Sequence, residues 1–230
     1  MRINEIIITE DSFNDDLSYE QVKSLVEKSC MPYLKKVGGF KNAVFKKPLF
    51  RGVRFFIKDP IKTVDVDQNR QPIDTPEVMH DIINDWFFKR TGIPFRSASI
   101  FCTGDWSDAR RYARDEGHVV TVIPVGEFNY CWSTVYNDMY EDLGDYVHKL
   151  DKIAGRNKDL TTKFLLDKPS NITNFLMKGK YTLNTGLLQA IASKKEVMIN
   201  CQQVIVISQD WVINHDEALQ NVNHQTLRIS

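Results

Sequence analysis

The chain has 230 residues, of which 42% are hydrophobic and 26% charged, a composition typical of a globular domain. Lys and Arg total 30, and Asp and Glu also total 30, so the overall charge gives no sign of a polyanion-binding protein or of an acidic tail. Any charged partner must therefore be recognised by a local patch. We predict a single domain over residues 1–230.

The cysteines and histidines argue against a metal site. Cys30, Cys102, Cys131 and Cys201 are far apart, and three of them fall in apolar, strand-like runs where a thiol behaves as a small hydrophobic side chain. The histidines form no close pair, and neither C-x-x-C nor H-E-x-x-H occurs. No apolar run approaches the roughly 18 residues of a membrane span, and we do not expect export by a classical signal. We expect a soluble protein of a reducing, cytoplasmic compartment.

The first part of the chain predicts helices. After a short strand around residues 4–8, Ser18 and Gln21 form a capping box that begins a helix, and Gly38 and Gly39 end it. Val22, Leu25 and Val26 share one face of that helix.

Two elements follow, a strand and the clearest helix of the chain. PLFRGVRFFI is rich in aromatic and β-branched residues and predicts a strand buried on both faces or nearly so, with Arg51 pointing inward or into a cleft. DTPEVMHDIINDWFFKRTG predicts a helix with Thr75 as N-cap, Pro76 in the first turn and Gly92 after the end. The apolar stripe of this helix consists of Val78, Met79, Ile82, Ile83, Trp86 and Phe87.

The middle of the chain is richer in strands. Residues 95–103 predict a strand, and a short helix follows with Asp105 as N-cap. The residues of this helix that are expected to face inward are Ala109, Tyr112 and Ala113. HVVTVIPV and FNYCWS predict two further strands.

The last part of the chain begins with an expected insertion at residues 137–185, acidic at its start and then lysine-rich and mainly helical. KKEVMINCQQVIVIS then supplies two adjacent strands, and we expect the polar tail beyond Trp211 to be loosely ordered. Helices first and mostly strands afterwards predict an α+β fold rather than a doubly wound sheet. No G-x-G-x-x-G occurs, so a Rossmann nucleotide site is not supported.

Polar residues lie at three places within or beside runs that otherwise predict buried strands, although each has an ordinary structural explanation. Arg51 can lay its stem on apolar neighbours and keep its head in water. In a regular strand Ser97, Ser99, Phe101 and Thr103 would share a face, which is either a site or a solvated edge. A carboxylate at Glu196 lies either at the rim of a cleft or in the charged turn SKKE.

The order and type of these residues resemble the mono-ADP-ribosyltransferases of the arginine-serine-glutamate class, which include bacterial toxins and phage-encoded enzymes. The family's first motif commonly reads aromatic-Arg-Gly, its central motif is Ser-Thr-Ser, and its last is a glutamate that opens an apolar strand. The helix in DARRYA and the strand ending in PVG add to the likeness, which covers roughly residues 48–133 and 182–208. The matching residues are Phe50, Arg51 and Gly52, then Ser97, Ala98 and Ser99, and last Glu196.

The resemblance implies an ADP-ribosyltransferase-like split β-sheet core with N-terminal helices and a helical insertion. It also implies transfer of ADP-ribose from NAD, as substrate, to a macromolecular acceptor, through a transition state similar to that of glycoside hydrolysis. The expected acceptor is a host protein, with nucleic acid as an alternative, and neither a membrane nor a metal is expected as a partner. A phage-encoded enzyme would act in the host cytoplasm.

The resemblance assigns a role to each matching residue. Glu196 would stabilise the positive charge that develops on the ribose, and Arg51 would hold a phosphate or ribose of NAD through its fork of donors, beside Gly52. Ser97 would bind the nicotinamide-ribose end and help to orient Glu196. Ser99 would support the strand geometry, although either hydroxyl can lead. Phe101 either offers a stacking face or belongs to the core.

Lys194 and Ala98 depart from the family pattern. Many members carry Glu or Gln two residues before the catalytic glutamate, and arginine-modifying members carry Glu, whereas this chain has Lys194. Ala98 replaces the central threonine, whose side chain is expected to point to the other face. Arg54 and Arg96, which each neighbour a matching residue, are rival anion binders. Arg54 is expected to face away from Arg51 on a regular strand, and Arg96 has an internal salt bridge as its alternative.

Three other functions remain open. The first is an NAD glycohydrolase, in which water replaces the acceptor. The second is a catalytically inactive phage or virion-associated interaction protein with the same fold, which Lys194 and the charged insertion favour. The third is nucleic-acid binding through residues 151–180, where seven Lys and Arg stand against three Asp, although a solvated helical face explains that small excess equally well.

Overall fold

The computed structural model describes residues 17–53, 59–72, 76–113, 118–154 and 169–216. Its centre is an eight-stranded sheet in the order β2-β8-β4-β1-β3-β7-β5-β6, in which every neighbouring pair is antiparallel. The predicted α+β class is therefore confirmed. The strands are β1 Phe50–Val53, β2 Ile61–Asp65, β3 Ile100–Thr103, β4 His118–Pro124, β5 Asn129–Ser133, β6 Tyr181–Leu183, β7 Glu196–Asn200 and β8 Gln203–Ser208.

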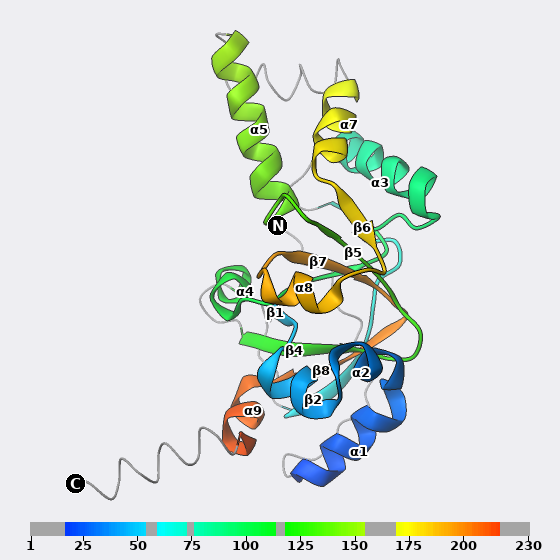
Figure 1. The fold of residues 1–230 in the computed structure, drawn as a ribbon, viewed down its shortest axis with the longest axis vertical. Coiled ribbons are helices and arrows are strands. Elements are labelled where there is room, and N and C mark those ends of the chain that lie inside the picture. Colours follow the sequence, from blue (N-terminus) through cyan, green and yellow to red (C-terminus); the bar gives the residue numbers. More distant parts are fainter. Residues whose placement is uncertain (1–16, 54–58, 73–75, 114–117, 155–168, 217–230) are drawn as a thin grey trace, which may run out of the picture.

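Helices pack at both ends of an elongated molecule (Figure 1). α1 and α2 lie at one end, and α3, α5 and α7 at the other, with α8 beside β7 in the middle. The helices are α1 Tyr19–Ser29, α2 Met31–Val37, the π-helical turn η1 Asn42–Lys46, α3 Glu77–Thr91, α4 Trp106–Ala113, α5 Met139–Ala154, α7 Pro169–Lys178, α8 Leu187–Ala192 and α9 Gln209–His215. In the part of the chain that the structure describes, no helix is long and apolar enough to cross a membrane.

Two hydrophobic clusters cover opposite faces of the sheet at β7. Val197 and Ile199 belong to the cluster formed with α1, α2 and α8, whereas Met198 belongs to the cluster formed with α3, α5 and α7. Successive side chains of a strand point to opposite faces, which explains the division. β7 is therefore buried on both sides, and a charged residue at its first position lies at the border of the core.

The capping residues that the sequence indicates are found in the structure. Ser18 and Gln21 form the capping box of α1, Gly38 adopts the left-handed conformation after α2, and the Asp105 carboxylate accepts from the backbone N–H of Asp108 in α4. The expected single N-terminal helix is instead two, because a new helix begins at Met31, with Pro32 in its first turn. Proline has no N–H and is favoured in a first turn.

The predicted strand 95–103 is wrong in its first half. The backbone N–H groups of Ser97 and Ala98 both donate to the Pro94 carbonyl, so residues 95–98 form a turn and β3 begins only at Ile100. Period-2 alternation therefore does not place Ser97 and Ser99 on the face that carries Phe101.

The inward faces of two helices also differ from expectation. In α3, Val78 is exposed and His80 is buried in its place, and Pro76 is the N-cap rather than a residue of the first turn. In α4, Ala109 and Ala113 are buried as predicted, but Tyr112 is exposed. Its hydroxyl donates to Asp138 instead of entering the core.

The C-terminal third differs from expectation in its strand pairing. Within 137–185, β6 pairs with β5, so this segment adds a strand to the sheet as well as helices. β7 and β8 are consecutive in the chain but lie far apart in the sheet order, on either side of β1. The expected loose order beyond Trp211 is wrong up to His215, which ends α9. The predicted strand at 4–8, the rival anion binder Arg54, the cap at Thr75 and residues 155–168 lie outside the described residues.

Candidate active site

The three motif strands are consecutive in the sheet: β1, β3 and β7. Phe50 pairs with Thr103, and Thr103 pairs with Glu196, so these three residues form one row across the strands. β1 and β3 share only that one pair, whereas β1 and β4 share four. Beside the single pair, the Arg51 Nη1 donates to the Phe101 carbonyl over 3.0 Å. The half-buried guanidinium thus bridges β1 and β3.

Gly52 allows α4 to lie directly on β1. A Cβ at this position would stand 2.1 Å from the carbonyl oxygen of Ala109 and 2.6 Å from the backbone nitrogen of Ala113. Such contacts are far inside van der Waals distance, so no other residue fits without moving the helix. The glycine of the first motif therefore has a packing function in this fold, where α4 covers it.

The serine motif forms a buried turn that leads into β3. Ser97 donates through Oγ to the Pro94 carbonyl over 3.2 Å, and its backbone N–H donates to Oδ1 of Asn84 over 3.1 Å. Ser99 is only 2% exposed, and its Oγ has no hydrogen-bond partner among the described residues. The first hydroxyl therefore holds the turn, whereas the second is buried without a partner in the described part of the chain.

Glu196 opens β7 beside the N-terminus of α5. Its backbone N–H donates to the Asn137 carbonyl over 2.7 Å, and the nearby backbone N–H of Met139 has a small lowering effect on the pKa of its carboxyl. Burial, and after it the neighbouring Asp138 carboxylate, raise the pKa of Glu196 to about 8 against the opposing effects of Arg96 and Arg70. A carboxyl with a pKa this close to neutrality is typical of functional sites.

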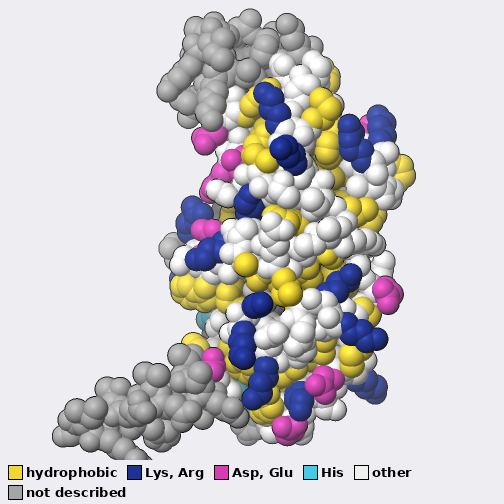
Figure 2. All heavy atoms as spheres, in the orientation of Figure 1, with side chains coloured by type: hydrophobic (Ala, Val, Ile, Leu, Met, Phe, Trp, Pro, Cys, Tyr) yellow, Lys and Arg dark blue, Asp and Glu magenta, His cyan; other side chains and the backbone are white. Residues whose placement is uncertain are grey.

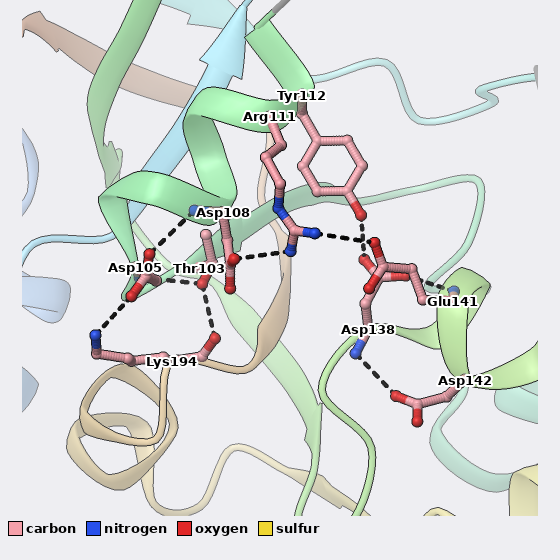
Figure 3. Close-up of polar contacts among 9 residues, drawn as sticks. All are labelled: Thr103, Asp105, Asp108, Arg111, Tyr112, Asp138, Glu141, Asp142 and Lys194. Carbon is pink, nitrogen blue, oxygen red and sulfur yellow. Dashed lines mark hydrogen bonds and ion pairs between the residues drawn. The ribbon is translucent and has the colours of Figure 1, made fainter. Parts of the chain in front are cut away.

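A polar network ties the segments around Glu196 together (Figure 3). On one side, Thr103 donates to the Lys194 carbonyl over 2.9 Å, and the Lys194 Nζ contacts Asp105 at 2.6 Å. On the other, Tyr112 donates to Asp138 over 2.8 Å, which joins α4 to the start of α5. These contacts fix the positions of four segments relative to one another: the turn before β7, the end of β3, α4 and α5.

Two further arginines lie beside the motif residues. The guanidinium carbons of Arg70 and Arg96 are 4.0 Å and 4.9 Å from the centroid of the Phe101 ring. No salt bridge to Arg96 occurs among the described residues, so the internal ion pair considered for it is absent from that part of the chain. Arg70 was not a sequence candidate, because it stands in an irregular loop without a periodic pattern.

His80 is a second functional candidate without a clear sequence signal. It is 4% exposed, and burial, together with the positive charges of Arg96 and Arg70, lowers its pKa to about 4. The spacing of His80 and Asn84 on α3 brings their side chains within 3.0 Å. That i, i+4 polar pair inside an apolar helix was the available signal.

The described residues contain no group of three or more His, Cys, Asp and Glu that could hold a metal ion. The four cysteines are buried thiols. Lys and Arg side chains on the face seen in Figure 2 are interspersed with uncharged and apolar ones, without a continuous basic patch. Comparison of the chain with protein-family models, curated proteins and solved structures finds no match.

Proposed function

We propose that this protein transfers the ADP-ribosyl group of NAD to a macromolecular acceptor on an ADP-ribosyltransferase-like split sheet. The observation that carries the proposal is the position of Arg51, Phe101 and Glu196 on three consecutive strands. The single residue pair between β1 and β3 supports a sheet that divides at this point. Ser99, whose hydroxyl is buried and unpartnered among the described residues, directly precedes β3.

The chemistry needs a carboxylate beside the ribose. The bond between the ribose C1′ and the nicotinamide nitrogen breaks, and its electron pair leaves with nicotinamide, which becomes neutral. Positive charge then develops on the ribose, the acceptor supplies the electron pair of the new C1′ bond, and the acceptor's proton is released. Ionised Glu196 would stabilise that charge. Because its pKa is about 8, the free protein holds mainly the neutral form at pH 7, and activity should rise with pH.

Lys194 argues against arginine as the acceptor. The family's arginine-modifying members carry Glu at this position, whereas here the Lys194 side chain is engaged by Asp105. Its backbone has a φ of 62°, which lies in the left-handed region and directs the turn into β7. We therefore propose an acceptor other than an arginine side chain.

The first experiment measures nicotinamide release from NAD, with and without bacterial lysate, for the wild type, Glu196→Gln and Glu141→Gln. Glu141 is an exposed carboxylate of α5 that pairs with Arg111 at 3.6 Å, which makes it the matched control. We expect release to fall about 100-fold or more in Glu196→Gln and to be unchanged in the control. In the wild type, kcat/KM should rise with pH, and the midpoint of that rise should lie near the Glu196 pKa of about 8.

The outcomes separate the alternatives. Release that depends on Glu196 and transfers label to a lysate component supports the transferase, whereas release without transfer supports an NAD glycohydrolase. If the wild type and Glu196→Gln are equally inert with and without lysate, the enzyme proposal is wrong and an inactive interaction protein is the better reading.

A further inference from the structure

Arg70 and Arg96 form a positively charged corner beside β3, against the ring of Phe101. Arg70 comes from the loop after β2 and Arg96 from the turn before β3, and Arg70 joins the two segments by donating to the Arg96 carbonyl over 2.8 Å and, from its backbone, to the Ser97 carbonyl over 3.0 Å. Both guanidiniums rest on the Phe101 ring, so their central carbons lie less than about 9 Å apart.

The positive charge of this corner is not balanced by an ion pair among the described residues. Neither Arg70 nor Arg96 has a carboxylate within salt-bridge distance there. Burial, followed by the like charges of Arg96 and Arg51, lowers the pKa of Arg70 to about 9 against the opposing effects of the Glu196 and Asp67 carboxylates. Partly buried like charges are costly unless an anion accompanies them.

Three buried hydrogen-bond donors on the turn before β3, or joined to it through Asn84, also lack acceptors. Within the described residues, Nε of Arg96, Nδ1 of His80 and Oγ of Ser99 are buried and have no partner. The Asn84 Oδ1 accepts from the Ser97 N–H, so its Nδ2 is the atom that donates to the His80 Nε2. Neutral His80 therefore carries its proton on Nδ1, as a buried donor without an acceptor.

From these contacts we infer that Arg70, Arg96 and His80, with Ser99, form a binding site for the diphosphate group of a nucleotide. The planar donor fork of a guanidinium matches the oxygens of a phosphate, and two forks held on one ring suit two linked phosphates. The inference deepens the proposed function by assigning the substrate's diphosphate to these residues, and it rests on that function only for NAD as the natural ligand.

The test is calorimetric binding of ADP-ribose, which carries the diphosphate but no scissile nicotinamide bond, to the full chain. Variants are Arg70→Gln and Arg96→Gln, and Arg90→Gln is the matched control because the Arg90 guanidinium lies 4.1 Å from the Trp86 ring on the exposed side of α3. Loss of a charged hydrogen bond should weaken binding about 10- to 100-fold in each of the two variants and leave the control unchanged. Arg96→Lys, which keeps the charge without the fork, should fall between wild type and Arg96→Gln.

Two competitors identify the chemistry that is recognised. Inorganic pyrophosphate should displace ADP-ribose from the wild type, whereas adenosine, which has no phosphate, should not. The inference is overturned if the wild type binds neither ADP-ribose nor pyrophosphate, or if Arg70→Gln and Arg96→Gln bind ADP-ribose as tightly as Arg90→Gln. Circular dichroism spectra that match the wild type separate lost binding from lost folding, and Arg96→Lys provides a milder variant.

The binding experiment tests the diphosphate site independently of the chemical step. If ADP-ribose binds through Arg70 and Arg96 but no Glu196-dependent nicotinamide release occurs, the diphosphate site stands and the transferase proposal fails. If release depends on Glu196 while the arginine variants bind normally, the transferase proposal stands and the diphosphate site is wrong.

Discussion

Replacement of Glu196 by glutamine should stabilise the protein at alkaline pH. Burial and Asp138 raise the pKa of Glu196 from 4.5 to about 8 in the folded protein, so the native state holds this proton more tightly than the unfolded chain does. The resulting contribution to stability is complete below pH 4.5 and is lost as the pH rises through about 8. Glutamine has a similar shape and does not titrate, so it avoids that loss.

The size of the effect follows from the two pKa values. A change from 4.5 to about 8, at about 1.4 kcal/mol for each pH unit, sets an upper bound of about 5 kcal/mol. Because Glu196 as a residue is half-buried rather than fully buried, we expect about 2 to 3 kcal/mol. The free energy of unfolding of Glu196→Gln minus that of the wild type should therefore grow by this amount between about pH 5 and about pH 9.

Urea unfolding followed by tryptophan fluorescence measures this difference at several pH values. Groups that titrate equally in both proteins cancel in the subtraction, and Glu141→Gln, at an exposed site, should show no comparable growth with pH. A difference that does not change with pH would refute the reasoning. A difference that falls as the pH rises would mean that Arg70 and Arg96 hold the Glu196 carboxylate more strongly than burial penalises it.

Three other changes test the architecture around the site. Gly52→Ala should cost about 3 kcal/mol of stability because its Cβ would meet the backbone of α4, and a loss below about 1 kcal/mol in urea unfolding would contradict this contact. Thr103→Val removes the donor to the Lys194 carbonyl and the acceptor for the Asp105 N–H, so it should cost about 1 to 3 kcal/mol and lower nicotinamide release, with Thr103→Ser restoring both. His80, whose pKa falls from 6.5 to about 4, contributes stability that is present above pH 6.5 and is lost on acidification through about 4; wild type and His80→Gln should therefore converge or cross below about pH 5, and parallel pH profiles would argue against a buried neutral imidazole.

Local elements could be predicted well because short-range interactions determine them. The capping box of Ser18 and Gln21, the left-handed Gly38 and the Asp105 cap are contacts within a few residues of the chain. Their donors and acceptors are therefore visible in the sequence. The same reasoning failed at Ser97, where two hydrogen bonds to the Pro94 carbonyl form a turn in place of an extended strand.

The composition of the candidate site depends on long-range pairing. The resemblance assigned Arg51 and Glu196 to one site, and the strand order β1-β3-β7 places their strands on either side of β3. No periodic pattern could have placed Arg70 against Arg96, because these residues are 26 positions apart and meet through a loop and a turn.

By itself, the sequence determined the α+β class, the main helices and strands, and the residue types from which a site could be built. It did so because capping and hydrophobic periodicity act over a few residues. Only the tertiary structure decided that Gly52 lies beneath α4, that the Ser99 hydroxyl is buried without a partner, and that Arg70 and Arg96 share the Phe101 ring. Those relations arise from strand order and helix packing, in which each contact depends on segments distant in the chain.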